Sequence, residues 1–160
     1  MDATGLGLLA ASFATGGLLA SITMVLTGGP RHAERWTLLC TALWYVFLLG
    51  FGHARHMGVG LVLFLAAGFV QNVAMIAMIA TLLAVAGPRL RGRVMGVRML
   101  AVYGLPLGLI GSGLLIERIG YPPTITVLAM IGLVFTIVIG VRWRTRMWQA
   151  RQAERVFDHP

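Results

Sequence analysis

The sequence predicts an all-α fold, an integral membrane helix bundle with five transmembrane helices. Length is the first observation, because a hydrocarbon core of roughly 30 Å needs about 20 apolar residues at a rise of about 1.5 Å per residue. Five apolar stretches approach or exceed this length, at residues 6–26, 37–52, 58–86, 97–116 and 124–141. Composition is the second observation, since 58% of the 160 residues are hydrophobic and only 11% are charged. Soluble domains average roughly 25% charged residues.

A soluble bundle of buried helices is the alternative fold, and the five stretches argue against it. A single small core leaves much of a chain of this length facing water, so a soluble bundle needs helices with polar outer faces. The apolar stretches have almost no such faces. Residues 1–142 therefore form the predicted transmembrane bundle, with the lipid bilayer as its surroundings.

The first stretch is expected to be a retained, membrane-spanning helix. No basic residue precedes the first stretch, and it is too long for the apolar region of a signal peptide. This acidic start, with Asp2 and no arginine, leads us to expect a missing segment upstream. Cys40, in the second stretch, is expected to act as a small hydrophobic side chain. It is the only cysteine, so no disulfide can form within the chain.

The third and fourth stretches carry polar residues and helix-breaking residues. Gln71 and Asn72 fall at the midpoint of the third stretch, and Gly87-Pro88 is expected to end it. The fourth stretch is rich in glycine, and Pro106 removes a backbone donor in mid-helix, so a kink or flexible point is predicted there.

Small residues recur at four-residue spacing in several stretches. Lipid gives helices no hydrophobic drive to associate, so contact depends on the close backbone approach that Gly, Ala, Ser and Thr permit. The predicted packing faces are Gly16 with Ala20, Gly17 with Ser21, Gly104 with Gly108, and Gly132 with Thr136 and Gly140.

The fifth stretch leads into a basic tail, residues 143–160. Trp143, Met147, Ala150 and Phe157 share one face of a helix there, and arginines lie on the others. A basic amphipathic helix at the anionic cytoplasmic leaflet fits this pattern.

The arginines divide between the two sides of the predicted bundle. All thirteen basic residues are Arg, and the formal net charge is +8. One side holds Arg31, Arg35, Arg89, Arg91, Arg93, Arg98, Arg142, Arg144, Arg146, Arg151 and Arg155, and the other holds only Arg55 and Arg118. Short cytoplasmic loops accumulate arginine, so the N-terminus is predicted outside and the C-terminus in the cytoplasm. Arginines placed in this way indicate membrane topology and not a nucleic-acid partner.

The connector after the third stretch is the most specific motif. Pro88 is followed by Arg91-Gly92-Arg93-Val94-Met95-Gly96, and then by Pro106-Leu107-Gly108. In these residues the chain resembles the drug- and siderophore-exporter-like branch of the major facilitator superfamily. The start of the first stretch, with Gly16-Gly17, and the third stretch, with Gly68 and Asn72, extend the resemblance. The connector at residues 28–35 departs from the family pattern.

The resemblance implies that the five stretches match helices eight to twelve of a twelve-helix transporter, with seven helices absent. It implies a plasma-membrane secondary transporter, an exporter of small amphipathic molecules that works by alternating access. The missing N-terminal half, or another membrane chain, would then be a partner, and the small-molecule substrate is unknown. Coupling to the proton gradient is implied by the family only, because no Asp or Glu lies inside the stretches to carry a proton.

Polar residues at membrane depth are costly, so they are the candidate site residues. The expected substrate pathway consists of Gln71, Asn72, Met75 and Tyr103. Gln71 and Asn72 point about 100° apart on a helix, and the alternative role for both is a hydrogen bond to a neighbouring helix. The expected gating motif is Arg91, Gly92, Arg93 and Gly96, and the expected flexible or packing positions are Gly104, Pro106 and Gly108.

Catalysis and metal binding are not expected. His53 and His56 lie in the outer connector without a nearby Cys or carboxylate, so no metal site is predicted. The carboxylates lie at membrane edges or in the tail, so no acid–base pair forms, and no cofactor is expected. The Gly87–Gly96 stretch lacks the Lys-Ser/Thr ending of a phosphate loop. A stand-alone, five-helix subunit that assembles with itself or another chain remains the alternative to a transporter, and a membrane enzyme is the third possibility.

Overall fold

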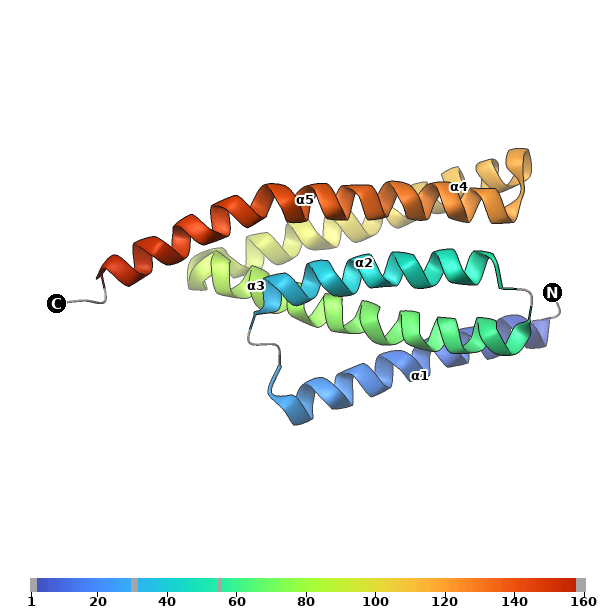
Figure 1. Cartoon of the computed structure of the whole chain (residues 1–160), viewed down its shortest axis with the longest axis horizontal. Coiled ribbons are helices and arrows are strands. Elements are labelled where there is room, and N and C mark those ends of the chain that lie inside the picture. The colour runs from blue at the N-terminus through green and yellow to red at the C-terminus, as the bar shows by residue number, and fades with distance from the viewer. Residues whose placement is uncertain (1–2, 30–31, 55, 158–160) are drawn as a thin grey trace.

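The computed structural model describes residues 3–29, 32–54 and 56–157, of which residues 3, 85, 87–89, 101 and 143–157 are described for their backbone alone. These residues form α1 (Ala3–Thr27), α2 (Ala33–Gly52), α3 (Met57–Tyr103), α4 (Leu105–Ile119) and α5 (Tyr121–Phe157), as Figure 1 shows. The predicted all-α fold class is confirmed.

Five helical segments are long and apolar enough to cross a membrane. They are Thr4–Thr27, Ala33–Gly52, Met57–Ala84, Leu90–Ile119 and Tyr121–Arg142. Many hydroxyl groups within them bond to carbonyls of their own helices, as in the bonds from Thr15 Oγ1 to the Ala11 carbonyl at 2.8 Å and from Thr23 Oγ1 to the Leu19 carbonyl at 2.7 Å. Such internal bonds satisfy polar groups where no water is available. The chain is therefore a multi-pass membrane protein.

Successive spans run in opposite directions (Figure 1). The connection between α1 and α2 lies at the same end of the bundle as the C-terminus, and the connection between α2 and α3 lies at the other end, with the N-terminus. Arg35, in the first turns of α2, and Arg118, in the last turn of α4, therefore lie at opposite ends. Arg31 and Arg55 lie outside the described residues.

The third membrane span ends at Ala84, close to the predicted end at Gly87-Pro88, but the helix itself is not interrupted there. The backbone stays helical through residues 87–96, and α3 reverses direction around this stretch instead (Figure 1). Pro88 removes one helical hydrogen bond. Most of the residues that follow it, among them Leu90, Arg91 and Met95, are strong helix formers with no turn cluster between them. The chain therefore reverses direction within residues that keep a helical backbone, and not in a loop.

The fourth span is divided into two helical segments. α3 ends at Tyr103 and α4 begins at Leu105, with Pro106 in its first turn. Proline suits this position because its fixed φ fits a helix start and its missing N–H has no partner there anyway. The interruption lies where Gly104 and Pro106 predict a kink; the flexibility of this point stays a prediction.

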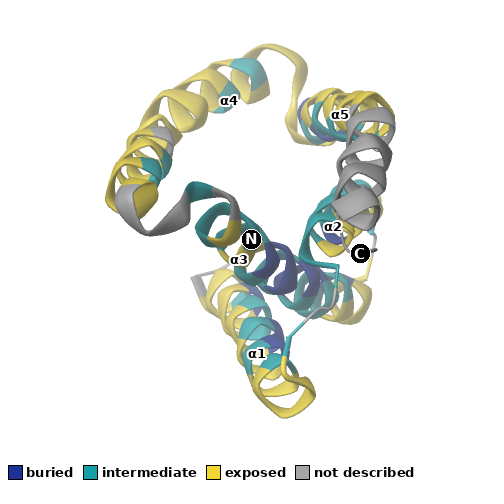
Figure 2. Ribbon diagram, turned by 90° about the vertical axis from the view of Figure 1, so that its left-hand side faces the viewer, coloured by how far each residue is buried: buried dark blue, intermediate teal, exposed yellow. Residues whose placement is uncertain are grey.

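The packed core lies between α1, α2 and the first part of α3. Its buried side chains are Ala20, Cys40, Val70, Val73 and Ala74, and Met24, Trp44, Phe47 and Phe69 pack against them. α5 docks on α2, where Gly132 faces the ring of Tyr45. The span Leu90–Ile119, by contrast, has an 18-residue apolar window with no buried residue, and Figure 2 shows α4 as mostly exposed.

α5 continues as one helix from its membrane-spanning part through Phe157. The predicted amphipathic face of the tail lies outside the described side chains, and residues 158–160 lie outside the described backbone.

Candidate functional site

α1 and α3 cross at a pair of glycines that leave no room for a side chain. A Cβ atom at Gly16 would collide with the backbone carbonyl of Leu65, and one at Gly68 would collide with that of Phe13. Only glycine permits this backbone approach. The predicted packing face at Gly16 and Ala20 is confirmed, since Ala20 is 0% exposed.

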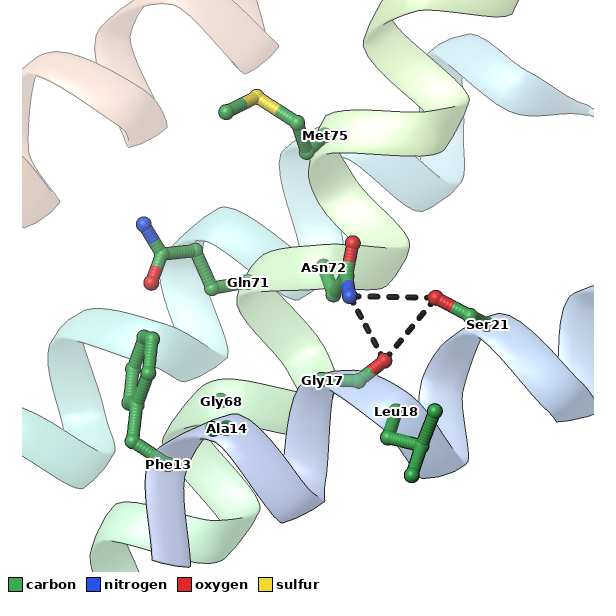
Figure 3. Close-up of a pocket in the computed structure, with 9 residues that line it drawn as sticks. All are labelled: Phe13, Ala14, Gly17, Leu18, Ser21, Gly68, Gln71, Asn72 and Met75. Atoms are coloured by element: carbon green, nitrogen blue, oxygen red, sulfur yellow. Dashed lines mark hydrogen bonds between the residues drawn. The ribbon is translucent and has the colours of Figure 1, made fainter. Parts of the chain in front are cut away.

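Asn72 joins the same two helices one turn further along. Its Nδ2 donates to the Gly17 carbonyl at 2.7 Å and to Ser21 Oγ at 3.3 Å, as Figure 3 shows. Ser21 Oγ in turn donates to the Gly17 carbonyl at 3.1 Å. The Asn72 amide group is therefore held in an interhelical bond, which is the alternative role that the sequence allows for it.

Replacing Asn72 with Leu should destabilise the bundle by about 0.6 to 2 kcal/mol, the range for interhelical hydrogen bonds in membranes. The matched control is the same substitution at the neighbouring amide, Gln71→Leu. That change removes a buried oxygen without a hydrogen-bond partner, so it should be neutral or stabilising. Unfolding in mixed micelles measures both; equal losses in the two variants would contradict the assignment.

Gln71 points to another side of α3 from Asn72 (Figure 3). Its Oε1 is buried without a hydrogen-bond partner among the described residues. It borders a pocket of about 570 Å³ between α1 and α3. The lining residues are Phe13, Ala14, Gly17, Leu18, Ser21, Gly68, Gln71, Asn72 and Met75. The pocket lies at membrane depth, because Met75 precedes the end of its span, Ala84, by about 14 Å of helix.

Arg98 reaches this region from the returning part of α3. Its Nη2 donates to the Met75 sulfur at 2.9 Å, and its Nε is buried without a hydrogen-bond partner within the described part of the chain. From the sequence, Arg98 is predicted only to help determine topology, and the structure shows that it also turns inward. Its position inside the apolar stretch 97–116, although one residue from the start, is the signal for this, because charged side chains within membrane spans are costly and face the protein interior.

The remaining candidates lie apart from the pocket. Tyr103 is 80% exposed on the last turn of α3, and it does not line the pocket with Gln71 and Met75. Arg91 and Arg93 are exposed, and Gly92 and Gly96 have open space beside them. Their gating role stays a prediction.

The predicted packing of the fourth span is not seen among the described residues. Gly108 has no atom of another element near the position of a Cβ, and Gly104 and Pro106 are exposed. These positions are therefore open to lipid or to another membrane chain.

The described residues hold no group of three His, Cys, Asp or Glu side chains that could bind a metal ion. His53 is exposed, and its Nδ1 lies 2.9 Å from the Leu49 carbonyl. Comparison of the chain with protein-family models, with curated proteins and with solved structures finds no match.

Proposed function

We propose that this chain forms one wall of a transport pathway for small amphipathic molecules across the plasma membrane. The observation that carries the proposal is the pocket between α1 and α3, where the unpartnered amide oxygen of Gln71 lies at membrane depth between apolar walls and Asn72, bonded to α1, completes the lining. Substrate sites of secondary transporters lie near the midplane and combine such polar groups with an apolar surface.

The proposal includes a partner. Leu100 and Leu107, on the two segments of the fourth span, are each 75% exposed, and Gly108 has free space beside it. An additional membrane chain, such as the other half of a major-facilitator-like transporter, could complete the pathway there and move against this wall in alternating access. The arginine distribution supports an orientation with the N-terminus outside.

The chain by itself is therefore expected not to transport. Reconstituted as a monomer in phospholipid vesicles, it should give no flux of fluorescent amphiphiles above that of empty vesicles, because one wall cannot enclose a pathway. Crosslinking in the same vesicles establishes the oligomeric state. Protein-dependent flux by the monomer would contradict the shared pathway.

In the complementary experiment, the chain is expressed together with the proteins encoded next to it, and flux of the same amphiphiles is measured in the resulting assembly. Flux should appear in that assembly and fall in Gln71→Leu. The exposed fourth span also fits the alternative function, a structural subunit of a membrane assembly. An assembly that forms and gives no flux would favour the subunit over the transporter.

A further inference from the structure

Two polar groups with buried, unpartnered atoms flank Met75: Gln71, which lines the pocket, and Arg98, which contacts the Met75 sulfur from outside the pocket lining. Gln71 lies one helical turn before Met75 on the same face of α3, and Figure 3 shows both side chains extending to the same side. Arg98 approaches Met75 from the returning part of α3 through its 2.9 Å contact with the sulfur. The buried atoms left over are the Nε donor of Arg98 and the Oε1 acceptor of Gln71.

The thioether is a poor partner for a guanidinium group. A Met sulfur is a weak acceptor, whereas a guanidinium offers five N–H donors in a planar fork that matches a carboxylate or phosphate. Within the membrane spans the described carboxylates are those of Glu34 and Glu117, in the first turn of α2 and the last turn of α4. Both lie at membrane edges, so neither supplies a counter-charge at the depth of Met75.

The pocket beside these groups is apolar over most of its wall. Phe13 and Leu18 of α1 and Met75 of α3 form much of it. A molecule that places an oxyanion at Arg98 can therefore bury an alkyl or aryl part against α1. The Gln71 amide can donate to the same oxyanion through its Nε2, whereas its Oε1 is an acceptor and takes no part in binding an anion.

We propose that Arg98 and Gln71 bind the anionic head group, phosphate or carboxylate, of an amphipathic molecule whose apolar part occupies this pocket. The inference rests on the proposed function, because it names the substrate class of that pathway. Binding is nevertheless measured without transport, so the two can fail separately. An anionic phospholipid and a free single-chain anion share this head-group chemistry, and the experiment distinguishes them.

The test uses the full chain in phosphatidylcholine nanodiscs, titrated with dodecyl phosphate and followed by calorimetry against empty nanodiscs. Dodecyltrimethylammonium, with the same chain length and the opposite charge, is the ligand control. Arg98→Gln should weaken dodecyl phosphate binding by about tenfold or more, as expected for the loss of a charge-assisted hydrogen bond. Arg98→Lys should retain part of the affinity, because the charge stays and the planar fork is lost. Arg118→Gln, on an exposed arginine at the other end of the bundle, should change binding less than about twofold.

Gln71→Leu provides a second reading if Arg98→Gln does not fold, as judged by its circular dichroism and thermal unfolding. It should weaken binding of the anion and leave the affinity for the cation unchanged. Repeating the titration in nanodiscs with about a fifth phosphatidylglycerol identifies the source of the ligand. Competition would assign the site to anionic lipid, and undiminished binding would assign it to a free amphiphile; both support the site.

Equal dodecyl phosphate affinity in wild type, Arg98→Gln and Gln71→Leu would overturn the inference, as would equal binding of the cation and the anion. A complete assembly that gives no flux but binds dodecyl phosphate through Arg98 would overturn only the proposed transport. Flux that survives Arg98→Gln unchanged, together with unchanged binding, would overturn only the anion site.

Discussion

Gly16→Ala should destabilise the bundle by about 1–3 kcal/mol, or separate α1 from α3 altogether. The new methyl group would meet the backbone carbonyl of Leu65, which cannot move aside as a flexible side chain would. The helices must therefore move apart along their whole contact. That movement would also disturb the bonds from Asn72 to Gly17, the next residue, and to Ser21, which lies between one and two turns further along α1.

Gly108→Ala is the matched control. It makes the same chemical change inside a helix, at a position where no other element lies within 4 Å of the new atom. Alanine is the better helix former by about 0.5–1 kcal/mol, so this variant should be unchanged or slightly more stable. Denaturant unfolding in mixed micelles, followed by far-ultraviolet circular dichroism, compares the two.

The pair separates packing from helix propensity. Similar stability changes in Gly16→Ala and Gly108→Ala would mean that close packing at the α1–α3 crossing does not stabilise the bundle. Gly68→Ala tests the reciprocal side of the crossing and should resemble Gly16→Ala, because its Cβ would meet the Phe13 carbonyl.

The apolar stretches predicted the fold class and the number of spans because lipid imposes a simple length rule on every helix that crosses it. The path of the chain between the third and fourth spans was not predictable in the same way. Gly87-Pro88 indicates a helix end locally, but the residues after it also favour a helix, and how the chain reverses depends on tertiary packing. The small-residue pattern has a similar limit: Gly16 packs against α3, whereas Gly108, in an equivalent pattern, has no neighbour.

The candidate site was predictable only in part. The midpoint rule selected Gln71 and Asn72, but periodicity could not decide which amide faces a neighbouring helix and which borders a pocket. In the structure, the Asn72 amide bonds to the neighbouring helix α1, and the Gln71 amide borders the pocket. Arg98 was missed as a pocket neighbour because its contact with Met75 joins residues 23 positions apart across the reversal of α3. Tyr103, which is expected to line the substrate pathway, is 80% exposed and lies outside the pocket, because α3 ends there on an exposed surface.

Cysteines at Leu90 and Ala54 should react with an impermeant thiol reagent from opposite sides of the membrane. Leu90 is 49% exposed near the reversal of α3, at the end of the bundle that holds Arg35, Arg91 and Arg93. Ala54 follows α2 at the other end. Because arginine-rich ends are retained in the cytoplasm, Leu90→Cys should be labelled only from the inside and Ala54→Cys only from the outside. The experiment needs a Cys40→Ala background, although the native thiol is buried.

The two ways in which this labelling can fail have different meanings. Labelling of both cysteines from one side would contradict the membrane crossing of Met57–Ala84, the most hydrophobic part of α3, and with it the depth assigned to Gln71 and Met75. Labelling from opposite sides but in the reverse sense would keep the spans and the pocket and contradict only the predicted orientation. A third cysteine at Glu117, in the last turn of α4, should follow Ala54 in either case, because the fourth span returns the chain to that end of the bundle. Glu117→Cys labelled together with Leu90→Cys would show that the interruption at Gly104 turns the chain back before it crosses.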